Sequence, residues 1–132
     1  MIALDTNVLV RYLVADDAAQ FAASQRTLSR LGPGADSGFV ADVVLVELVW
    51  VLRAAYDFSR VDILSALEAL ASADHLTFED DERLSRVLRA FADGRGDFAD
   101  YLIRERAIVA GCETVQTFDK VLQAEKGFSA PV

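Results

Sequence analysis

Apolar residues along the chain occur in two alternating patterns. Short continuous apolar runs, which are typical of buried strands, lie at residues 2–4, 38–40, 76–78 and 114–118. Between these runs, apolar residues recur every three or four positions, which predicts helices at 7–13, 16–31, 42–56, 59–73, 80–93 and 97–110. Strands that alternate with helices favour an α/β fold with a central, mainly parallel β-sheet flanked by α-helices. No internal repeat or linker divides the chain, so we expect residues 1–132 to form a single domain.

Polar residues and glycine mark the ends of the predicted helices. We expect Asn7, Asp42 and Ser59 to cap the helices that follow them, because their side-chain oxygens can accept hydrogen bonds from the unpaired N–H groups of a helix start. Gly111 is placed to end the last predicted helix in the left-handed conformation. One apolar stripe is expected along the helix at 59–73, formed by Val61, Leu64, Leu67 and Leu70.

The composition narrows the possible classes of protein. Of 132 residues, 53% are hydrophobic and 26% are charged, which excludes an intrinsically disordered, collagenous or low-complexity chain. With 13 Lys and Arg against 21 Asp and Glu, the net charge is −8. This charge argues against a protein that coats DNA or RNA, since such a protein needs cations to replace the counterions of the phosphates.

Three further features indicate a cytoplasmic location. The first apolar run ends at Asp5, without the basic and long apolar regions of a secretory signal. The most apolar stretch, at 43–52, contains Glu47, and it has only about half of the roughly 20 residues that a membrane span needs. Cys112 is the only cysteine, which excludes an internal disulfide and a cysteine-based zinc site, and we expect it to be a small core residue.

Asp5 and Asp119 each follow a predicted strand directly. In open α/β sheets, ligands bind outside the carboxyl ends of the strands, so an aspartate at such a place is well positioned for chemistry. Each could instead cap the helix or turn that follows, a role that aspartate fills well. The occurrence of two such residues, each after its own apolar strand, favours the chemical interpretation.

Glu47 lies within the apolar stretch at 43–52. A carboxylate in such surroundings needs a partner, because an unpaired buried charge is costly. The partner would be one of the eleven arginines, a hydrogen-bond network or a metal ion. An apolar helix with one acid also suits a helix wedged between the sheet and a second subunit.

Asp97 and Asp100 open the helix at 97–110. Asp97 is most simply its N-cap, and Asp100 could bond back to the chain as the acid of a capping box. Asp100 could equally point towards Asp5. Asp100 and Asp119 are 19 residues apart, which is the length of one helix, one turn and one strand, so both can return to the same edge of the sheet.

Clustered carboxylates without His or Cys partners are hard oxygen ligands that suit Mg²⁺ or Mn²⁺ rather than zinc. His75, the only histidine, is expected at the surface, so a histidine-based zinc centre and a Ser-His-Asp triad are not indicated. Gly94-Arg95-Gly96 lacks the spacing of a nucleotide-binding loop, and Arg95 could either steer a phosphate or remain solvated. Several acids that hold one or two Mg²⁺ ions are typical of phosphodiester hydrolysis.

With these residues, the sequence resembles the PIN-domain proteins, specifically the VapC ribonuclease toxins of type II toxin–antitoxin pairs. The resemblance spans nearly the whole chain, and its four segments carry weight because they occur together in this order and spacing. The segments are Ile2-Ala3-Leu4-Asp5-Thr6-Asn7-Val8-Leu9-Val10, Val46-Glu47-Leu48-Val49-Trp50-Val51-Leu52, Asp97-Phe98-Ala99-Asp100-Tyr101-Leu102-Ile103 and Thr117-Phe118-Asp119.

The resemblance implies a catalytic set of four acids: Asp5, Glu47, Asp100 and Asp119. Asp5 and Asp100 would bind the metal directly with Asp119 as a further ligand, while Glu47 and Asp119 would complete the pocket and position water. Small polar residues beside the acids would support them from behind: Thr6, Asn7 and Thr117. Asp97, a frequent extra acid in this subgroup, could join the site or serve only as a cap.

The resemblance also implies a Mg²⁺-dependent endoribonuclease, with Mn²⁺ as a possible substitute, that acts on RNA as a homodimer and is neutralised by a VapB-type antitoxin. Two residues depart from the family pattern, Tyr101 and Arg104, where many members have smaller residues. The alternative is a catalytically silent PIN-like module that holds a protein or RNA partner. A Mg²⁺-dependent phosphatase fits less well, because the start Asp5-Thr6-Asn7 lacks a second aspartate two residues on.

Overall fold

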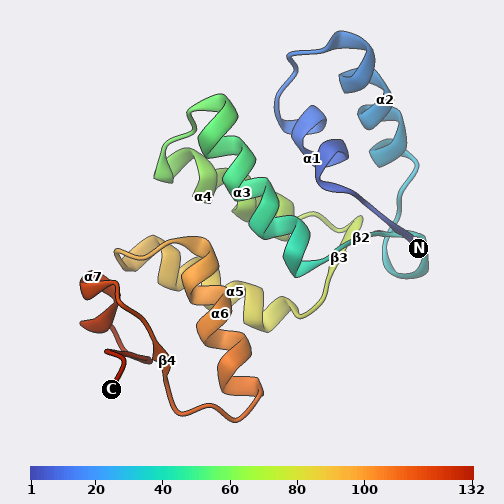
Figure 1. Ribbon diagram of the computed structural model, residues 1–132. Helices are drawn as coiled ribbons and strands as arrows, with labels where there is room; N and C mark the ends of the chain where they lie inside the picture. Colours follow the sequence, from blue (N-terminus) through green and yellow to red (C-terminus); the bar gives the residue numbers. More distant parts are fainter. The chain divides into compact units, whose positions relative to one another are not determined.

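The structure is a computed structural model that describes all 132 residues. The chain divides into two compact units, unit 1 (Met1–Asp81) and unit 2 (Glu82–Val132), each of which is described by itself. Figure 1 follows the helices and strands along the chain.

Unit 1 is built on a three-stranded parallel sheet. Its strands, in the spatial order β1-β2-β3, are β1 (Ile2–Ala3), β2 (Gly38–Val40) and β3 (Leu76–Phe78). Gly38 pairs with Ile2 on one side and with Leu76 on the other, so the carboxyl ends of the three strands lie at the same edge. The helical segments of this unit are α1 (Thr6–Leu13), α2 (Ala18–Ser29), the 3₁₀ turn η1 (Gly34–Asp36), α3 (Asp42–Tyr56) and α4 (Arg60–Ala71).

Two helix starts of unit 1 differ from the predicted ones. Asp5, not Asn7, caps α1, because its side chain accepts a hydrogen bond from the N–H of Thr6 and the chain is already helical at Asn7. Asp42 is the first residue of α3 rather than its cap, and its N–H donates to the carboxylate of Glu79 over 3.1 Å. Both predictions were wrong because the capping residue is the one that keeps extended backbone geometry, which depends on where the preceding strand ends.

Helix α4 begins as predicted but buries a different stripe. Ser59 and Asp62 form a capping box, each side chain accepting from the backbone N–H of the other residue. The buried side chains of α4 are Ile63, Leu67 and Leu70. Val61 is 75% exposed, because two positions along a helix correspond to a rotation of about 200° and place it opposite Ile63.

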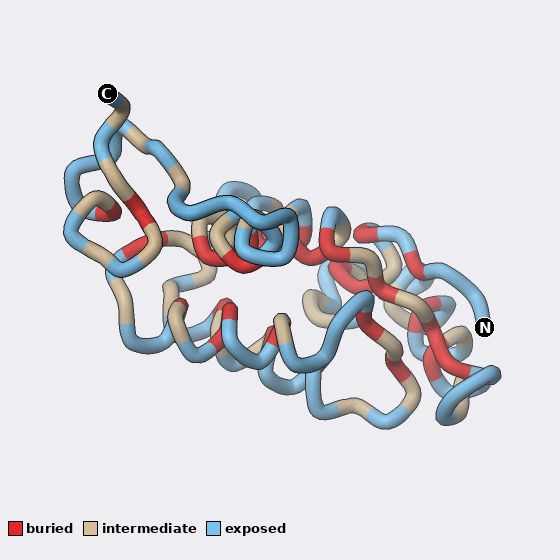
Figure 2. Tube along the Cα trace, turned by 90° about the horizontal axis from the view of Figure 1, so that it is seen from below, coloured by how far each residue is buried: buried red, intermediate tan, exposed pale blue.

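The core of unit 1 is formed where α1, α3 and α4 turn one side inwards. Buried residues alternate with exposed ones along these helices. Figure 2 shows buried and exposed residues intermixed in this way along the chain. The most completely buried side chains here are Leu9, Leu45, Leu48, Leu52 and Ile63. This core holds the starts of α1 and α3 in place at the carboxyl edge of the sheet, where β1 and β2 end.

Unit 2 contains two parallel strands and three helices. The elements are α5 (Asp81–Asp93), α6 (Phe98–Val109), β4 (Val115–Gln116), α7 (Lys120–Gln123) and β5 (Phe128–Ser129), with Val115 paired to Phe128. The strand at 114–118 is therefore shorter than predicted. β5 was not predicted at all, because Phe128 is its only apolar residue and forms no apolar run that would indicate a strand.

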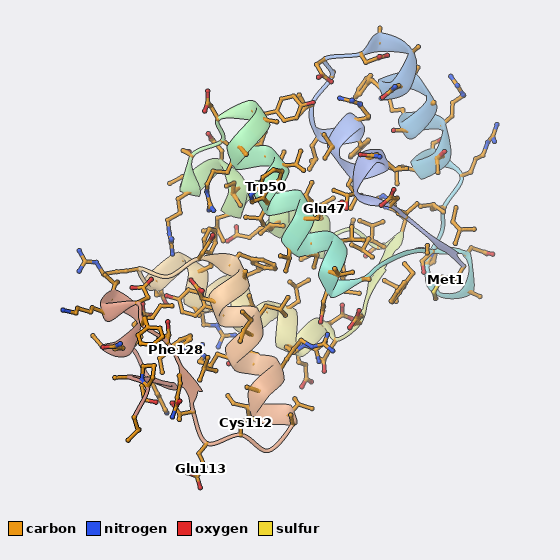
Figure 3. All side chains as sticks on the ribbon, viewed as in Figure 1. Met1, Glu47, Trp50, Cys112, Glu113 and Phe128 are labelled. Atoms are coloured by element: carbon orange, nitrogen blue, oxygen red, sulfur yellow. The ribbon has the colours of Figure 1, made fainter.

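The ends of α6 agree with the sequence. Asp97 is the N-cap, and Gly111 has the left-handed φ of 90° expected of the residue that ends the helix. Cys112 follows Gly111 and is exposed, so the prediction that it packs in the core was wrong. Figure 3 shows Cys112 and Glu113 on the connection between α6 and β4, outside any element whose period could bury them.

The fold class is confirmed: parallel strands alternate with α-helices along the chain. None of the helices is both long and apolar enough to cross a membrane.

Candidate active site

Asp5 stands where β1 passes into α1. Its Oδ1 atom accepts a hydrogen bond of 2.8 Å from the N–H of Thr6, and its Oδ2 atom takes part in no hydrogen bond. Thr6 is buried while Asp5 and Asn7 are exposed. The cap therefore fixes the carboxylate at the carboxyl edge of the sheet and leaves one of its oxygens open to solvent.

Glu47 is exposed on α3, contrary to the prediction of a buried carboxylate. It forms no ion pair with an arginine and no hydrogen bond. The buried positions of α3 follow the helical period, and they are Asp42, Leu45, Leu48, Val49 and Leu52. Glu47 lies off that stripe. The apolar composition of the segment wrongly suggested that Glu47 is buried, whereas the helical period correctly places Glu47 outside the buried set.

The face of α3 that carries Glu47 is largely apolar. Val43 is 72% exposed and Trp50 is 68% exposed, at positions four before and three after Glu47. Residues at these spacings neighbour one another on a helix surface. Figure 3 shows Glu47 and Trp50 projecting from α3. Glu47 is therefore a solvated carboxylate between apolar neighbours.

Asp97 and Asp100 form the predicted capping box at the start of α6. The Asp97 carboxylate accepts from the N–H of Phe98 at 2.8 Å and from the N–H of Asp100. In return, the N–H of Asp97 donates to Oδ2 of Asp100 at 2.8 Å. Both residues are half-buried. Oδ1 of Asp100 takes part in no hydrogen bond, so this acid too keeps one oxygen available.

Asp119 is the N-cap of the short helix α7. Its Oδ1 atom accepts from the N–H groups of Val121 at 2.9 Å and Leu122 at 3.4 Å. Its own N–H donates to the hydroxyl of Thr117 over 3.1 Å, so Thr117 shapes the turn on which Asp119 sits. Oδ2 of Asp119 is left without a hydrogen bond.

Glu105 is the buried acid that the sequence reasoning missed. It is only 6% exposed, and its two oxygens accept from Nε of Arg86 at 2.8 Å and Nε of Arg104 at 3.2 Å. The signal was present in the helical period, because the buried residues of α6 are Phe98, Tyr101, Leu102 and Glu105. Its paired state identifies Glu105 as a structural acid of unit 2.

Two pockets within the units are lined by residues other than the predicted acids. One of about 480 Å³ in unit 2 is lined by the second half of α6, including Arg104 and Ile108, and by Cys112 and Lys126. Another of about 490 Å³ in unit 1 lies between Met1 and the end of α2. Neither contains Asp5, Glu47, Asp97, Asp100 or Asp119.

Each unit therefore holds part of the predicted acidic set. Asp5 and Glu47 belong to unit 1, while Asp97, Asp100 and Asp119 belong to unit 2. Within neither unit do three or more His, Cys, Asp or Glu side chains form a group that could hold a metal ion. Three of the acids, Asp5, Asp100 and Asp119, share one arrangement, in which a helix start binds one carboxylate oxygen and leaves the other.

Comparison with known proteins agrees with the resemblance seen in the sequence. Residues 2–127 match the family described as PIN domain. The chain is also similar to a protein of Aquifex aeolicus (strain VF5) named VapC ribonuclease, with 24% identity over 117 residues that cover 89% of this chain and 86% of that protein. Since the match to the family extends over nearly all of its residues, the chain belongs to the PIN domain family.

Proposed function

We propose that this protein is a metal-dependent endoribonuclease, the toxin of a VapBC-type toxin–antitoxin pair, and that residues 1–132 act as a single PIN domain. Asp5, Glu47, Asp100 and Asp119 are its catalytic acids. The observation that carries the proposal is the shared arrangement of Asp5, Asp100 and Asp119, each fixed by a helix start with one oxygen left over. Membership of the PIN family and similarity to a protein named VapC ribonuclease support the same reaction.

The residues fit a hard divalent cation. Asp5, Asp100 and Asp119 would hold it through the carboxylate oxygens that the caps leave free, and oxygen ligands of this kind favour Mg²⁺, with Mn²⁺ as a substitute. When bound, such an ion lowers the pKa of a coordinated water and stabilises charge on phosphate oxygens. The backbone N–H groups would orient the carboxylates, since their hydrogen bonds hold each carboxylate in place before a metal ion binds.

The remaining residues have supporting roles in this proposal. Glu47 is solvated and unpaired, so it is free to accept a proton or to orient a water molecule beside the RNA. Thr117 holds the turn of Asp119, and Asp97 holds Asp100 through their reciprocal bonds. Thr6 and Asn7 lie in the first turn of α1, directly after Asp5.

The proposal extends to partners and location. We infer a homodimer in the cytoplasm that is neutralised by a VapB-type antitoxin. Support comes from the similarity to a VapC protein and from the exposed apolar side chains on α3, Val43 and Trp50, which a protein partner would cover favourably. No helix capable of spanning a membrane is present.

The test is RNA cleavage by the purified protein with labelled single-stranded and stem-loop RNAs in Mg²⁺ or Mn²⁺. Asp5→Asn is the sharpest variant, because asparagine caps a helix as well as aspartate does and the fold is preserved while the charge is lost. We expect cleavage to fall at least about 100-fold, equivalent to about 2.7 kcal/mol of barrier. Asp74→Asn removes the same charge at an exposed acid between α4 and β3 and should leave the rate unchanged.

Two outcomes would decide against the proposal. Cleavage that survives in Asp5→Asn, or in excess chelator, would remove the metal-dependent mechanism. Tight RNA or protein binding by a wild-type chain that cleaves no RNA would instead favour the catalytically silent module.

A further inference from the structure

Tyr101, which follows Asp100 directly, is completely buried and links two distant segments of unit 2 through its hydroxyl group. The hydroxyl oxygen accepts a hydrogen bond of 2.8 Å from the N–H of Gly96. The hydroxyl proton is donated to Oε1 of Glu125 over 2.6 Å. The other oxygen of Glu125 accepts from the N–H of Arg95 at 3.2 Å. One tyrosine and one glutamate thus hold the loop before α6 against the segment after α7.

The glycines of that loop are fitted to this pair of side chains. A Cβ atom on Gly94 would lie 2.0 Å from the Tyr101 hydroxyl oxygen and 2.6 Å from Oε1 of Glu125. A Cβ atom on Gly96 would lie 2.6 Å from Leu122 and 3.0 Å from the Tyr101 ring. Real Cβ atoms essentially never come within 3.0 Å of such atoms, so Gly94 requires glycine while Tyr101 is in place. At Gly96, a Cβ atom would force the Leu122 side chain and the Tyr101 ring to move. The segment Gly94-Arg95-Gly96 therefore packs closely against Tyr101. The sequence alone did not reveal this contact.

Arg104 closes the other side of Tyr101. Its guanidinium carbon lies 5.1 Å from the centre of the Tyr101 ring and 5.8 Å from that of Phe128, within the range of cation–π attraction. Its Nη1 atom also donates to the carbonyl oxygen of Lys126 at 3.2 Å. The two residues that depart from the family pattern, Tyr101 and Arg104, thus act on the same segment, at 125–128.

The connections along the chain relate this network to the acids of unit 2. Gly96 precedes Asp97, Tyr101 follows Asp100, and Glu125 ends the short segment that Asp119 begins. The Tyr101 hydroxyl is therefore bonded to the segments that carry the three predicted acids of unit 2. A shift of the Tyr101–Glu125 bond would move the start of α6 relative to the start of α7.

We propose that Tyr101 and Glu125 are positioning residues of the candidate active site, which fix Asp100 and the loop of Asp97 relative to Asp119. The inference rests on the proposed function for its chemical meaning, because the acids need a fixed spacing only if they share a ligand. It goes beyond that function because it assigns the spacing of the acids to Tyr101 and Glu125, which take no direct part in the reaction. Arg104 keeps the pair in place from the side.

The experiment compares Tyr101→Phe, Glu125→Gln and the double variant with the wild-type chain. Tyr101→Phe removes only the hydroxyl group. Glu125→Gln leaves a single side-chain oxygen, which can replace only one of the two carboxylate oxygens that accept from Tyr101 and from the N–H of Arg95. The matched control is Tyr56→Phe, which also deletes a hydroxyl that donates to an acid, Asp16, and accepts from an arginine, Arg11. Thermal unfolding and circular dichroism first establish that each variant is folded.

Three measurements follow on each folded variant. Hydrogen exchange of the Gly96 and Asp97 amides reports whether the loop and Asp100 are still held, because the Asp97 N–H donates to Asp100. Mn²⁺ binding by electron paramagnetic resonance reports the acid arrangement without any reaction. RNA cleavage is analysed as kcat and KM separately.

For Tyr101→Phe we expect faster exchange at Gly96 and Asp97, Mn²⁺ affinity weaker by about 10-fold, and a lower kcat with little change in KM. Glu125→Gln should show a smaller loss of the same kind, and the double variant should lose less than the two single losses combined, since both act through one bond. Tyr56→Phe should match the wild type in all three measurements. If Tyr101→Phe does not fold, Glu125→Gln replaces it as the deciding variant.

The proposal is overturned if Tyr101→Phe exposes the Gly96 amide while Asp97 exchange, Mn²⁺ affinity and kcat stay at wild-type values. Tyr101 would then be a core side chain only. A wild-type chain that cleaves no RNA and binds no Mn²⁺ refutes the proposed function instead. In that case the Asp97 exchange alone decides whether Tyr101 and Glu125 hold the acids in place.

Discussion

The two units hold their carboxylates by partly different means. In unit 1, Asp5 and Glu47 are exposed, with a single backbone bond to Asp5 and none to Glu47. In unit 2, Asp119 is an exposed cap like Asp5, whereas Asp97 and Asp100 are half-buried and bonded to each other's backbone. Tyr101 also ties the loop of Asp97 to the segment after α7.

The difference teaches that the acids of one predicted site need not be oriented by the same means. A cap such as that of Asp5 is local and depends on residues adjacent in sequence. The arrangement in unit 2 depends on contacts between residues 5 to 30 positions apart, such as Gly96 with Tyr101 and Arg95 with Glu125. Asp97 and Asp100 should therefore be more sensitive than Asp5 to substitutions at residues that carry no chemistry.

The largest expected difference between the units is in the free energy of unfolding after a glutamate of each unit, Glu105 or Glu47, is replaced by alanine. Glu105→Ala leaves Arg86 and Arg104 without their buried partner, and we expect it to lower the free energy of unfolding by about 3 kcal/mol. The value stays at the low end for buried pairs because the side chain of Arg86 is 46% exposed and can be solvated. Glu47→Ala should change the free energy of unfolding by less than about 0.5 kcal/mol.

Urea unfolding of both variants checks this contrast. Similar losses for Glu47→Ala and Glu105→Ala, whether both large or both small, would mean that the two glutamates do not differ in burial and pairing as described, and the contrast between the units would then fail.

A smaller effect is expected from a methyl group placed beside Tyr101. Gly94→Ala would bring its Cβ atom into the Tyr101 hydroxyl and Glu125, so the loop must shift, at a cost of about 2 kcal/mol. Gly32→Ala in unit 1 is the control, since its Cβ would meet Asp36 at an ordinary 3.5 Å. Thermal unfolding should show a clear fall in Tm for Gly94→Ala alone. Equal Tm values would show that Tyr101 is not seated tightly in the loop.

The smallest effect concerns an exposed cluster of unit 1. The hydroxyl of Tyr56 donates to Asp16 and holds the pKa of that carboxyl below its ordinary value of 3.8; burial opposes this shift, and the charge of Arg11 adds to it. A carboxyl whose pKa is lower in the folded state stabilises the protein at pH values above its pKa in the unfolded state. This contribution is lost as the pH falls through the pKa of the folded state. The pH window therefore lies below about 4.

Tyr56→Phe should raise the pKa of Asp16 towards its ordinary value, as followed by NMR titration of the Asp16 carboxyl carbon. Stability near neutral pH should depend on pH as in the wild type, because Asp16 is ionised there in both proteins. An unchanged pKa would assign the shift to Arg11 rather than to the hydroxyl.

Much of the local structure could be predicted from the sequence. The strands at 38–40 and 76–78 were predicted with the correct bounds, and the caps at Ser59 and Asp97 and the left-handed Gly111 were identified correctly. These features depend on residues a few positions apart. One error arose where apolar composition was used in place of period, as for Glu47, and another where a strict three-residue spacing was used in place of the 3.6-residue period, as for Val61. A third arose where no element surrounds a residue, as for Cys112.

The sequence by itself determined the alternation of parallel strands and helices, the family of the chain and the positions of its acids, because motifs and short-range periods are written along the chain. Only the tertiary structure decided that Arg86 and Arg104 pair with Glu105, and that Gly94, Gly96 and Glu125 enclose Tyr101. Such contacts join residues that are distant along the chain. They depend on how side chains pack in three dimensions, which no local pattern records.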